Sequence, residues 1–143
     1  MRHRKHTFKI GRTGSHNRCM LANMLKSLIE HGRIETSVTK AKELRRHADK
    51  IVTMAKKNTL ASKRSAIAKL MIRFNELTPK EHRAAKGGDI SSYNCDRKVI
   101  GMLFGELRER MATRPGGYTR IIRKGFQISD AQEKCYIEFV ESI

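Results

Sequence analysis

The chain is poor in the residues that build disulfide-bonded or membrane-spanning proteins. Its three cysteines, Cys19, Cys95 and Cys135, are widely spaced and form no Cys-x-x-Cys pair. We therefore expect neither a disulfide framework nor a zinc ribbon, but free thiols packed as small apolar residues in a reducing compartment. No apolar run approaches the roughly 20 residues that span a bilayer, and the start has no signal-peptide core, so we expect a soluble chain without a leader.

Catalytic motifs are also missing. The sequence contains no Gly-x-Ser-x-Gly, no P-loop and no Gly-x-Gly-x-x-Gly. Ser15 and His16 are adjacent, but the first carboxylate of the chain is Glu30. His3 and His6 have a metal-like spacing without a further ligand at a recognisable distance, which favours hydrogen bonding to phosphates and bases over metal binding. We expect no enzyme, no cofactor and no metal site.

Acidic residues are scarce as well. Thirty-one Lys and Arg face fourteen Asp and Glu, so the formal net charge of the 143-residue chain is +17. Such an excess raises affinity for polyanions, which include nucleic acid, anionic membranes and acidic proteins. The length predicts one domain with one modest core.

The basic charge is concentrated at the start of the chain. Residues 1–18 hold six Lys or Arg and three His and no acidic residue. With so few apolar side chains, this segment cannot bury enough surface to offset the entropy of ordering it. We therefore expect an extended basic arm over residues 1–14 and a single globular domain over residues 15–143.

Apolar periodicity predicts the elements of that domain. Helical spacing indicates helices over residues 16–31, 40–57, 60–77, 79–86 and 95–112. Alternation indicates strands over residues 33–39, 118–124 and 134–141. We expect N-caps at Ser15, Thr39, Thr78 and Asn94. The order α-β-α-α-α-α-β-β predicts an α+β two-layer fold with helices on one face of a small three-stranded mixed sheet.

Candidate RNA contacts fall into three groups. The arm and the start of the first helix contribute Arg2, His3, Arg4, Lys5, His6, Lys9, Arg12, Ser15, His16 and Arg18. The second helix contributes Lys40, Lys42, Arg45 and Arg46. The turn before the second strand and the start of that strand contribute Arg114, Gly116, Gly117, Tyr118 and Arg120. Arginine forks onto phosphate oxygens, and glycine lets the backbone approach a phosphate.

Several of these assignments have equally simple structural alternatives. Tyr118 either stacks on a base or is a strand residue with an exposed hydroxyl. Gly116 and Gly117 either contact RNA or form a turn that needs positive φ, and both can hold at once. The charged face of the second helix is either solvated or bound to nucleic acid.

Folded RNA suits this chain better than duplex DNA. Irregular RNA offers loops and 2′-hydroxyls to a threaded arm and a basic platform. The sequence has no helix-turn-helix spacing, basic zipper or zinc finger with which to read a DNA groove. An architectural DNA-binding protein is the alternative, because it shares the charge argument.

The chain resembles the bacterial large-subunit ribosomal protein L-seventeen family over nearly its whole length. The matching motifs are Met1-Arg2-His3-Arg4-Lys5, Ser15-His16, Lys40-Ala41-Lys42-Glu43-Leu44-Arg45-Arg46, Gly116-Gly117-Tyr118-Thr119-Arg120-Ile121 and the closing Ile137-Glu138. The resemblance implies a non-catalytic structural component of the cytoplasmic ribosome with an α+β fold. It also implies binding to the large-subunit (23S) rRNA near the exit side of the nascent-chain tunnel, beside the small ribosomal protein L-thirty-two.

The chain departs from the family pattern in two places. Thr39 stands where family members often have proline, which affects how the strand leads into the second helix. The stretch 71–95 is longer than in compact members, so the resemblance implies nothing about its contacts.

Overall fold

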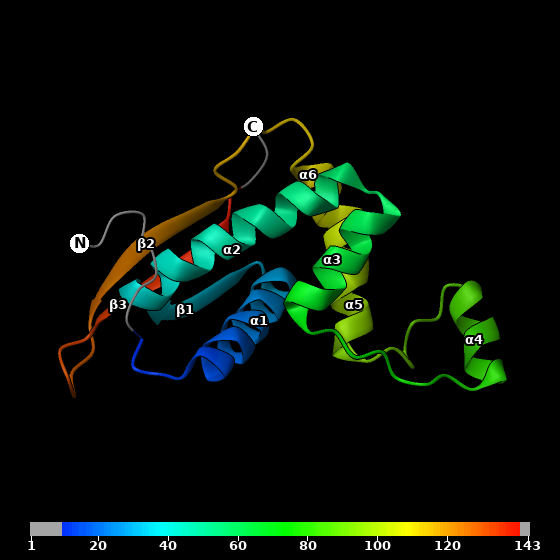
Figure 1. Ribbon diagram of the computed structural model, residues 1–143, viewed down its shortest axis with the longest axis horizontal. Helices are drawn as coiled ribbons and strands as arrows, with labels where there is room; N and C mark the ends of the chain where they lie inside the picture. Colours follow the sequence, from blue (N-terminus) through cyan, green and yellow to red (C-terminus); the bar gives the residue numbers. More distant parts are fainter. Residues whose placement is uncertain (1–9, 141–143) are drawn as a thin grey trace.

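A computed structural model describes residues 10–140 of the chain (Figure 1). The elements are α1 (Gly14–His31), β1 (Arg33–Ser37), α2 (Val38–Lys57), α3 (Leu60–Leu70), α4 (Pro79–Lys86), α5 (Cys95–Met102), the π-helical turn η1 (Leu103–Leu107), α6 (Arg108–Arg110), β2 (Thr119–Phe126) and β3 (Glu133–Phe139). The predicted α+β class is confirmed. The basic residues expected at positions 1–9 of the arm lie outside the described range.

The three strands form an antiparallel sheet in the order β1-β3-β2. Ile137 of the central β3 pairs with Ile34 of β1 and with Ile121 of β2. The prediction of a mixed sheet is wrong. Strands β1 and β2 run in the same direction, so a parallel pair would require them to be neighbours. Strand β3 lies between them instead.

Helix α2 is the centre of the molecule. It contacts α1, α3, η1, α6 and all three strands. Its buried stripe, Leu44, Ala48, Ile51, Val52 and Ala55, follows the three- and four-residue spacing of the sequence. In Figure 1, α1 and α2 cover one face of the sheet, as the two-layer prediction requires. The apolar face of α2 is therefore committed to the core, and its polar face is left for solvent or a partner.

Helix α3 ends seven residues earlier than expected. Met71 adopts a left-handed conformation with φ of 51°, and its amide closes the last turn on the carbonyls of Ile67 and Ala68. The apolar period continues to Leu77, but Phe74 is 46% exposed and is not a core residue. Lys26 of α1 donates to the carbonyl of Met71 at 3.4 Å, so a tertiary contact stabilises a helix end that periodicity does not reveal.

The longer segment between α3 and α5 forms an excursion, which we define as residues 71–94. Its helix α4 has no buried residue and stands apart from the other helices in Figure 1. Side chains close its base: Asn75 donates to the carbonyl of Ser92 at 2.9 Å, and Arg97 donates to the side-chain and backbone oxygens of Asn75 at 3.0 and 2.8 Å. The ends of the excursion are therefore held together independently of α4.

Of the four predicted N-caps, two are confirmed. Thr78 accepts from the amide of Glu81, and Asn94 accepts from the amide of Arg97. Ser15 and Thr39 instead lie inside their helices, because the N-caps are two residues earlier, at Thr13 and Ser37, and make no side-chain cap bond.

Of the three cysteines, Cys135 is packed in the core as expected, whereas Cys19 and Cys95 are not. Cys135 is buried, and burial raises the pKa of its thiol. Cys19 and Cys95 are exposed rather than packed in the core, and the Cys95 thiol donates to Glu30 at 3.1 Å. All three thiols are free, as predicted.

Candidate nucleic-acid interface

The start of α1 presents a cluster of exposed polar and basic side chains: Arg12, Ser15, His16 and Arg18. No acidic residue occupies the first turn, where the free amides and the helix dipole already carry positive charge. Asn17 donates to the carbonyl of Arg12 at 3.2 Å and fixes how the chain leads into the helix. The remaining members of this predicted group, Arg2, His3, Arg4, Lys5, His6 and Lys9, lie outside the described residues.

The basic face of α2 lies opposite its buried stripe. Lys42, Arg45 and Arg46 are exposed, and Lys40 is half-buried. Glu43, which is only 6% exposed, pairs with Arg46 and His47 at 3.4 Å each. Lys50 is exposed four residues beyond Arg46 and continues the same face. The helix therefore presents basic groups over several turns, with Glu43 buried beside them.

The turn before β2 is organised by a lysine from α2. Lys56 donates to the carbonyl of Arg114 at 2.6 Å and to the hydroxyl of Tyr118 at 3.5 Å. Tyr118 is 2% exposed, so its ring belongs to the core. The prediction that this ring stacks on a base is therefore wrong, and the exposed hydroxyl of the alternative is not observed either.

The two glycines of the turn differ in backbone conformation. Gly117 has φ of 63°, which confirms the expected need for positive φ at that position. Gly116 has no such constraint and is exposed, and a Cβ added to it would meet no other atom within 4 Å. Gly117 is exposed and uncrowded as well, so both glycines offer the open backbone surface that the sequence suggested.

Arg120 is engaged on the sheet. Its Nε and Nη2 donate to one carboxylate oxygen of Glu138 at 3.0 and 2.7 Å. Glu138 also pairs with Arg33 at 3.5 Å from the opposite strand. The charge of Arg120 is thus compensated within the protein, which separates it from the cations on α1 and α2.

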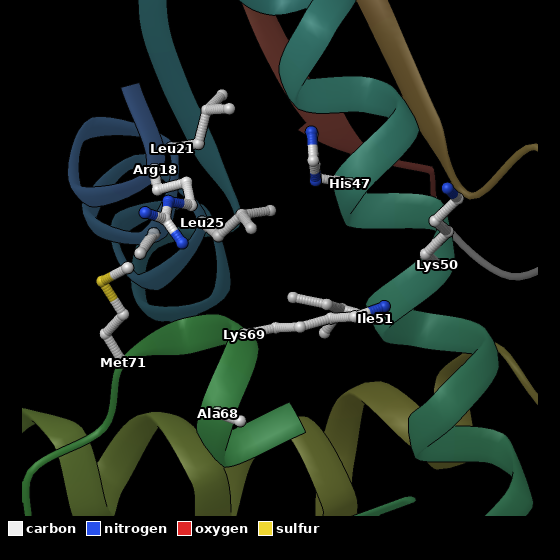
Figure 2. A pocket seen from close by; sticks show the side chains of 10 residues that line it. Arg18, Leu21, Leu25, His47, Lys50, Ile51, Ala68, Lys69 and Met71 are labelled. Carbon is white, nitrogen blue, oxygen red and sulfur yellow. The ribbon is translucent and has the colours of Figure 1, made fainter. Parts of the chain in front are cut away.

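A basic cleft lies where α1, α2 and α3 meet. It has a volume of about 490 Å³, and no carboxylate of the described residues lines it. Figure 2 shows Leu25 of α1 facing Ile51 of α2 across it, with Ala68 and Lys69 of α3 at one end and Met71, just after α3, beside α1. Its cationic residues are Arg18, Lys50 and Lys69, and the imidazole of His47 lines it beside them.

The structure thus brings only part of the predicted site together. Arg18 joins the middle of the α2 face through this cleft, whereas the 114–118 turn contacts Lys56 near the C-terminal end of the helix. The sequence-based prediction did not include His47, Lys50 and Lys69 as site residues. Lys50 was detectable from its spacing to Arg46, but His47 and Lys69 join the cleft only through the packing of α2 and α3.

Neither a metal cluster nor a membrane span is found in the described part of the chain. Within residues 10–140, no group of three or more His, Cys, Asp or Glu side chains is placed to hold a metal ion. No helix in that range is long and apolar enough to cross a membrane.

Comparison with known proteins places the chain in a family of ribosomal proteins. The family model for "Ribosomal protein L17" matches residues 20–140. The chain belongs to this family, whose members are structural and non-enzymatic.

Similar proteins match the chain over almost its full length. A protein of Chlamydia abortus is 62% identical over 140 residues, covering 98% of this chain and 99% of the relative. One of Chlamydia pneumoniae is 61% identical over 142 residues, covering 99% and 100%. One of Protochlamydia amoebophila is 61% identical over 140 residues, covering 98% and 99%. Each is named large ribosomal subunit protein bL17.

Proposed function

We propose that this chain is a structural constituent of the large ribosomal subunit that binds large-subunit rRNA through its basic arm and the basic surfaces of α1 and α2. The observation that carries the proposal is the cleft, where basic groups from three helices converge and no carboxylate within residues 10–140 lines the wall. Family membership supports the ribosomal setting.

The chemistry of binding follows from charge and rigidity. Lys and Arg neutralise phosphates and release condensed counterions, which is favourable at low salt. Helices α1 and α2 are packed through a shared core, so the helices that carry these basic side chains are fixed relative to each other before RNA arrives. Arg12, His16 and Arg18 are exposed at the start of α1, directly after the basic residues of the arm in the sequence.

Salt titration of rRNA binding tests this proposal. In the full-length chain, Arg2, Arg4, Lys5, Lys9 and Arg12 are replaced by Gln, and affinity for a large-subunit rRNA fragment is measured against salt concentration. Each lost phosphate contact lowers the log–log slope by about 0.7–0.9, so the loss of all five should lower the slope by roughly 3.5–4.5. The control replaces Lys80, Arg83 and Lys86 of α4 by Gln, and we expect its slope to change little. Equal loss per charge in both variants would mean diffuse attraction rather than an arm contact.

A competition experiment distinguishes this proposal from the alternative, an architectural DNA-binding protein. We expect rRNA fragments to displace bound duplex DNA, and the protein to sediment with the large subunit in a lysate. Preferential retention of duplex DNA would contradict the proposal.

A finer location is part of the same proposal. We place the protein near the exit side of the nascent-chain tunnel, beside ribosomal protein L-thirty-two, as the family resemblance implies. Crosslinking in intact subunits, followed by mass spectrometry, measures this neighbourhood. Crosslinks only to proteins distant from the tunnel exit would refute the location while leaving rRNA binding intact.

A further inference from the structure

We propose that the cleft between α1, α2 and α3 holds one unstacked nucleotide of the bound RNA, with its base against the apolar floor and its phosphates at the basic rim. This inference rests on the proposed function and deepens it. It specifies that the cleft binds a single nucleotide of the RNA.

The floor of the cleft has the apolar character that a base requires. Leu21, Ala22, Leu25 and Ile51 line it, and each is at most 9% exposed. Met71 is 40% exposed and adds a polarisable side chain at the edge. Its sulfur lies 3.9 Å from the Cys19 thiol, and its carbonyl accepts from Lys26. The wall that Met71 forms is therefore anchored to α1.

The rim has the charge that a phosphate requires. Arg18, Lys50 and Lys69 come from three different helices, and no ion pair within residues 10–140 occupies any of them. Each is exposed. Arginine and lysine bind phosphate oxygens with charge-assisted hydrogen bonds. The three cations surround an apolar floor. This arrangement suits a nucleotide, because its phosphate is anionic and its base is aromatic.

Two planar side chains stand at the same cleft. The Arg18 guanidinium and the His47 imidazole are groups on which splayed RNA bases commonly stack. His47 pairs with Glu43 at 3.4 Å, which restrains the ring on α2. The volume of about 490 Å³ lies in the range of roughly 300–1,000 Å³ that ligand sites show. One nucleotide, rather than a duplex, fits this combination of size and stacking groups.

Charge excludes other occupants. A second copy of this chain carries a net charge of +17 and would be repelled from a basic rim. The chain's own first residues are equally basic. An acidic apolar peptide would match the basic rim and the apolar floor, but it would not use the planar side chains of Arg18 and His47. The observations therefore favour a nucleotide.

Methyl NMR on the full-length protein tests the cleft directly. The signals of Leu21, Leu25, Ile51 and Met71 are followed during titration with AMP, UMP and ribose 5-phosphate, which keeps the phosphate and lacks the base. We expect both nucleotides to shift these methyls and ribose 5-phosphate to shift them far less. Equal shifts from all three would mean an anion site only and would overturn the proposal. A response to an acidic apolar peptide of sequence Asp-Leu-Glu-Phe-Asp, but not to nucleotides, would indicate a protein partner and would also overturn it.

A pair of matched variants connects the cleft to RNA. Ala68 is exposed at the cleft, and Ala61 is exposed on the same helix away from it. We expect Ala68→Leu to abolish the nucleotide shifts and to weaken rRNA binding about five- to tenfold, the lower part of what one stacked base contributes. Ala61→Leu should leave both unchanged. If Ala68→Leu unfolds, Lys69→Gln against Arg64→Gln makes the same comparison with one charge removed from α3.

The outcomes separate this inference from the proposed function. If the wild type and Ala68→Leu bind rRNA equally well, the cleft proposal fails and rRNA binding stands. If mononucleotides bind the cleft but Ala68→Leu leaves rRNA affinity unchanged, the cleft takes free nucleotides, which also overturns the proposal. If the wild type does not bind rRNA at all, the proposed function itself fails.

Discussion

At the scale of single residues, basic side chains in this protein serve two different purposes. Lys56 uses its ammonium to hold the Arg114 carbonyl, and Lys124 pairs with Glu35 at 2.6 Å. Arg120 is paired with Glu138. Lys42 and Lys69 have no such partner within residues 10–140. Net charge alone does not distinguish these roles, because it counts cations that the fold uses and cations that a ligand can use.

The two glycines of the 114–118 turn allow a matched test of whether a position with positive φ requires glycine. We expect Gly117→Ala to lower the free energy of unfolding by about 1–2 kcal/mol, because φ of 63° is left-handed and places Cβ against the following carbonyl. Gly116→Ala should leave stability unchanged or slightly higher, since nothing crowds its Cβ. Urea denaturation of both variants measures the difference. If Gly116→Ala instead weakens rRNA binding at unchanged stability, the open backbone at Gly116 contacts RNA.

Asp96 predicts a pH dependence of folding. Burial alone raises the pKa of this carboxyl, but hydrogen bonds from Lys26 and the Arg73 amide, at 2.8 and 2.7 Å, together with their positive charges, lower it below 3.8. The charged form therefore stabilises the fold, fully above pH 3.8, and this contribution is lost as the pH falls through the lower folded-state pKa. We expect Asp96→Asn to cost about 1–3 kcal/mol at pH 7.

Denaturation of Asp96→Asn and wild type across pH 2–7 measures this effect, and we expect the two stability curves to converge in acid. Glu76→Gln is the control, because it removes the same charge from an exposed position in the excursion. A difference that stays constant down to the most acidic conditions would show that Asn fails for steric reasons rather than for lack of charge.

At the scale of elements, prediction succeeded where the signal is local. The helix of residues 79–86 carries its own start signals in Thr78, Pro79 and Glu81, and the structure begins it there. The end of α3 depends on Met71 turning left-handed under the Lys26 contact, and no local pattern encodes that. The order β1-β3-β2 likewise depends on which strand of the β2–β3 hairpin pairs with β1. That pairing is a tertiary contact, and the local sequence does not encode it.

The candidate site was predictable only in part, for the same reason. The groups on α1 and α2 were predictable, because charge at helical spacing marks an exposed face. The cleft was not, because Lys69 and Met71 reach it only when α3 stops at Leu70 and packs beside α1 and α2. Tyr118 and Arg120 were assigned to RNA from the local string of residues 114–120, but Lys56 and Glu138, which lie outside that string, engage them.

The excursion behaves as a separable element. Deleting residues 77–90 and joining the ends with two glycines should change the free energy of unfolding by less than about 0.5 kcal/mol, because α4 has no buried residue and surface changes cost little. The Asn75–Ser92 and Asn75–Arg97 hydrogen bonds remain to close the base. Thermal and urea denaturation measure stability. A loss of several kcal/mol would show that α4 supports the core.

At the scale of the whole molecule, charge is distributed asymmetrically. The open face of the sheet is a compensated ladder: Glu138 pairs with Arg33 and Arg120, and Glu35 pairs with Lys124 and Lys134. The helical side has the cleft, which no carboxylate of residues 10–140 lines. Acidic residues therefore do not dilute the positive charge evenly: they compensate cations of the sheet face, whereas Arg18, Lys50 and Lys69 of the cleft have no ion pair within residues 10–140.

This distribution predicts that added salt stabilises the free protein. The net charge of +17 makes the fold repel itself, and salt screens that repulsion within a Debye length of about 10 Å at 0.1 M. We expect the Tm to rise by several degrees, on the order of 1 kcal/mol, between about 0.02 and 0.3 M sodium chloride. The compensated pairs on the sheet face oppose this rise, but exposed pairs contribute little each.

The five-site Gln variant of the arm provides the control for this last prediction. Its net charge is lower by five, so its Tm should start higher at low salt and rise less steeply as salt is added. Sodium sulfate would stabilise any protein through exclusion, so the comparison uses sodium chloride only. A Tm that falls with salt in both proteins would show that the ion pairs of the sheet face outweigh the repulsion among the cations of the helical side.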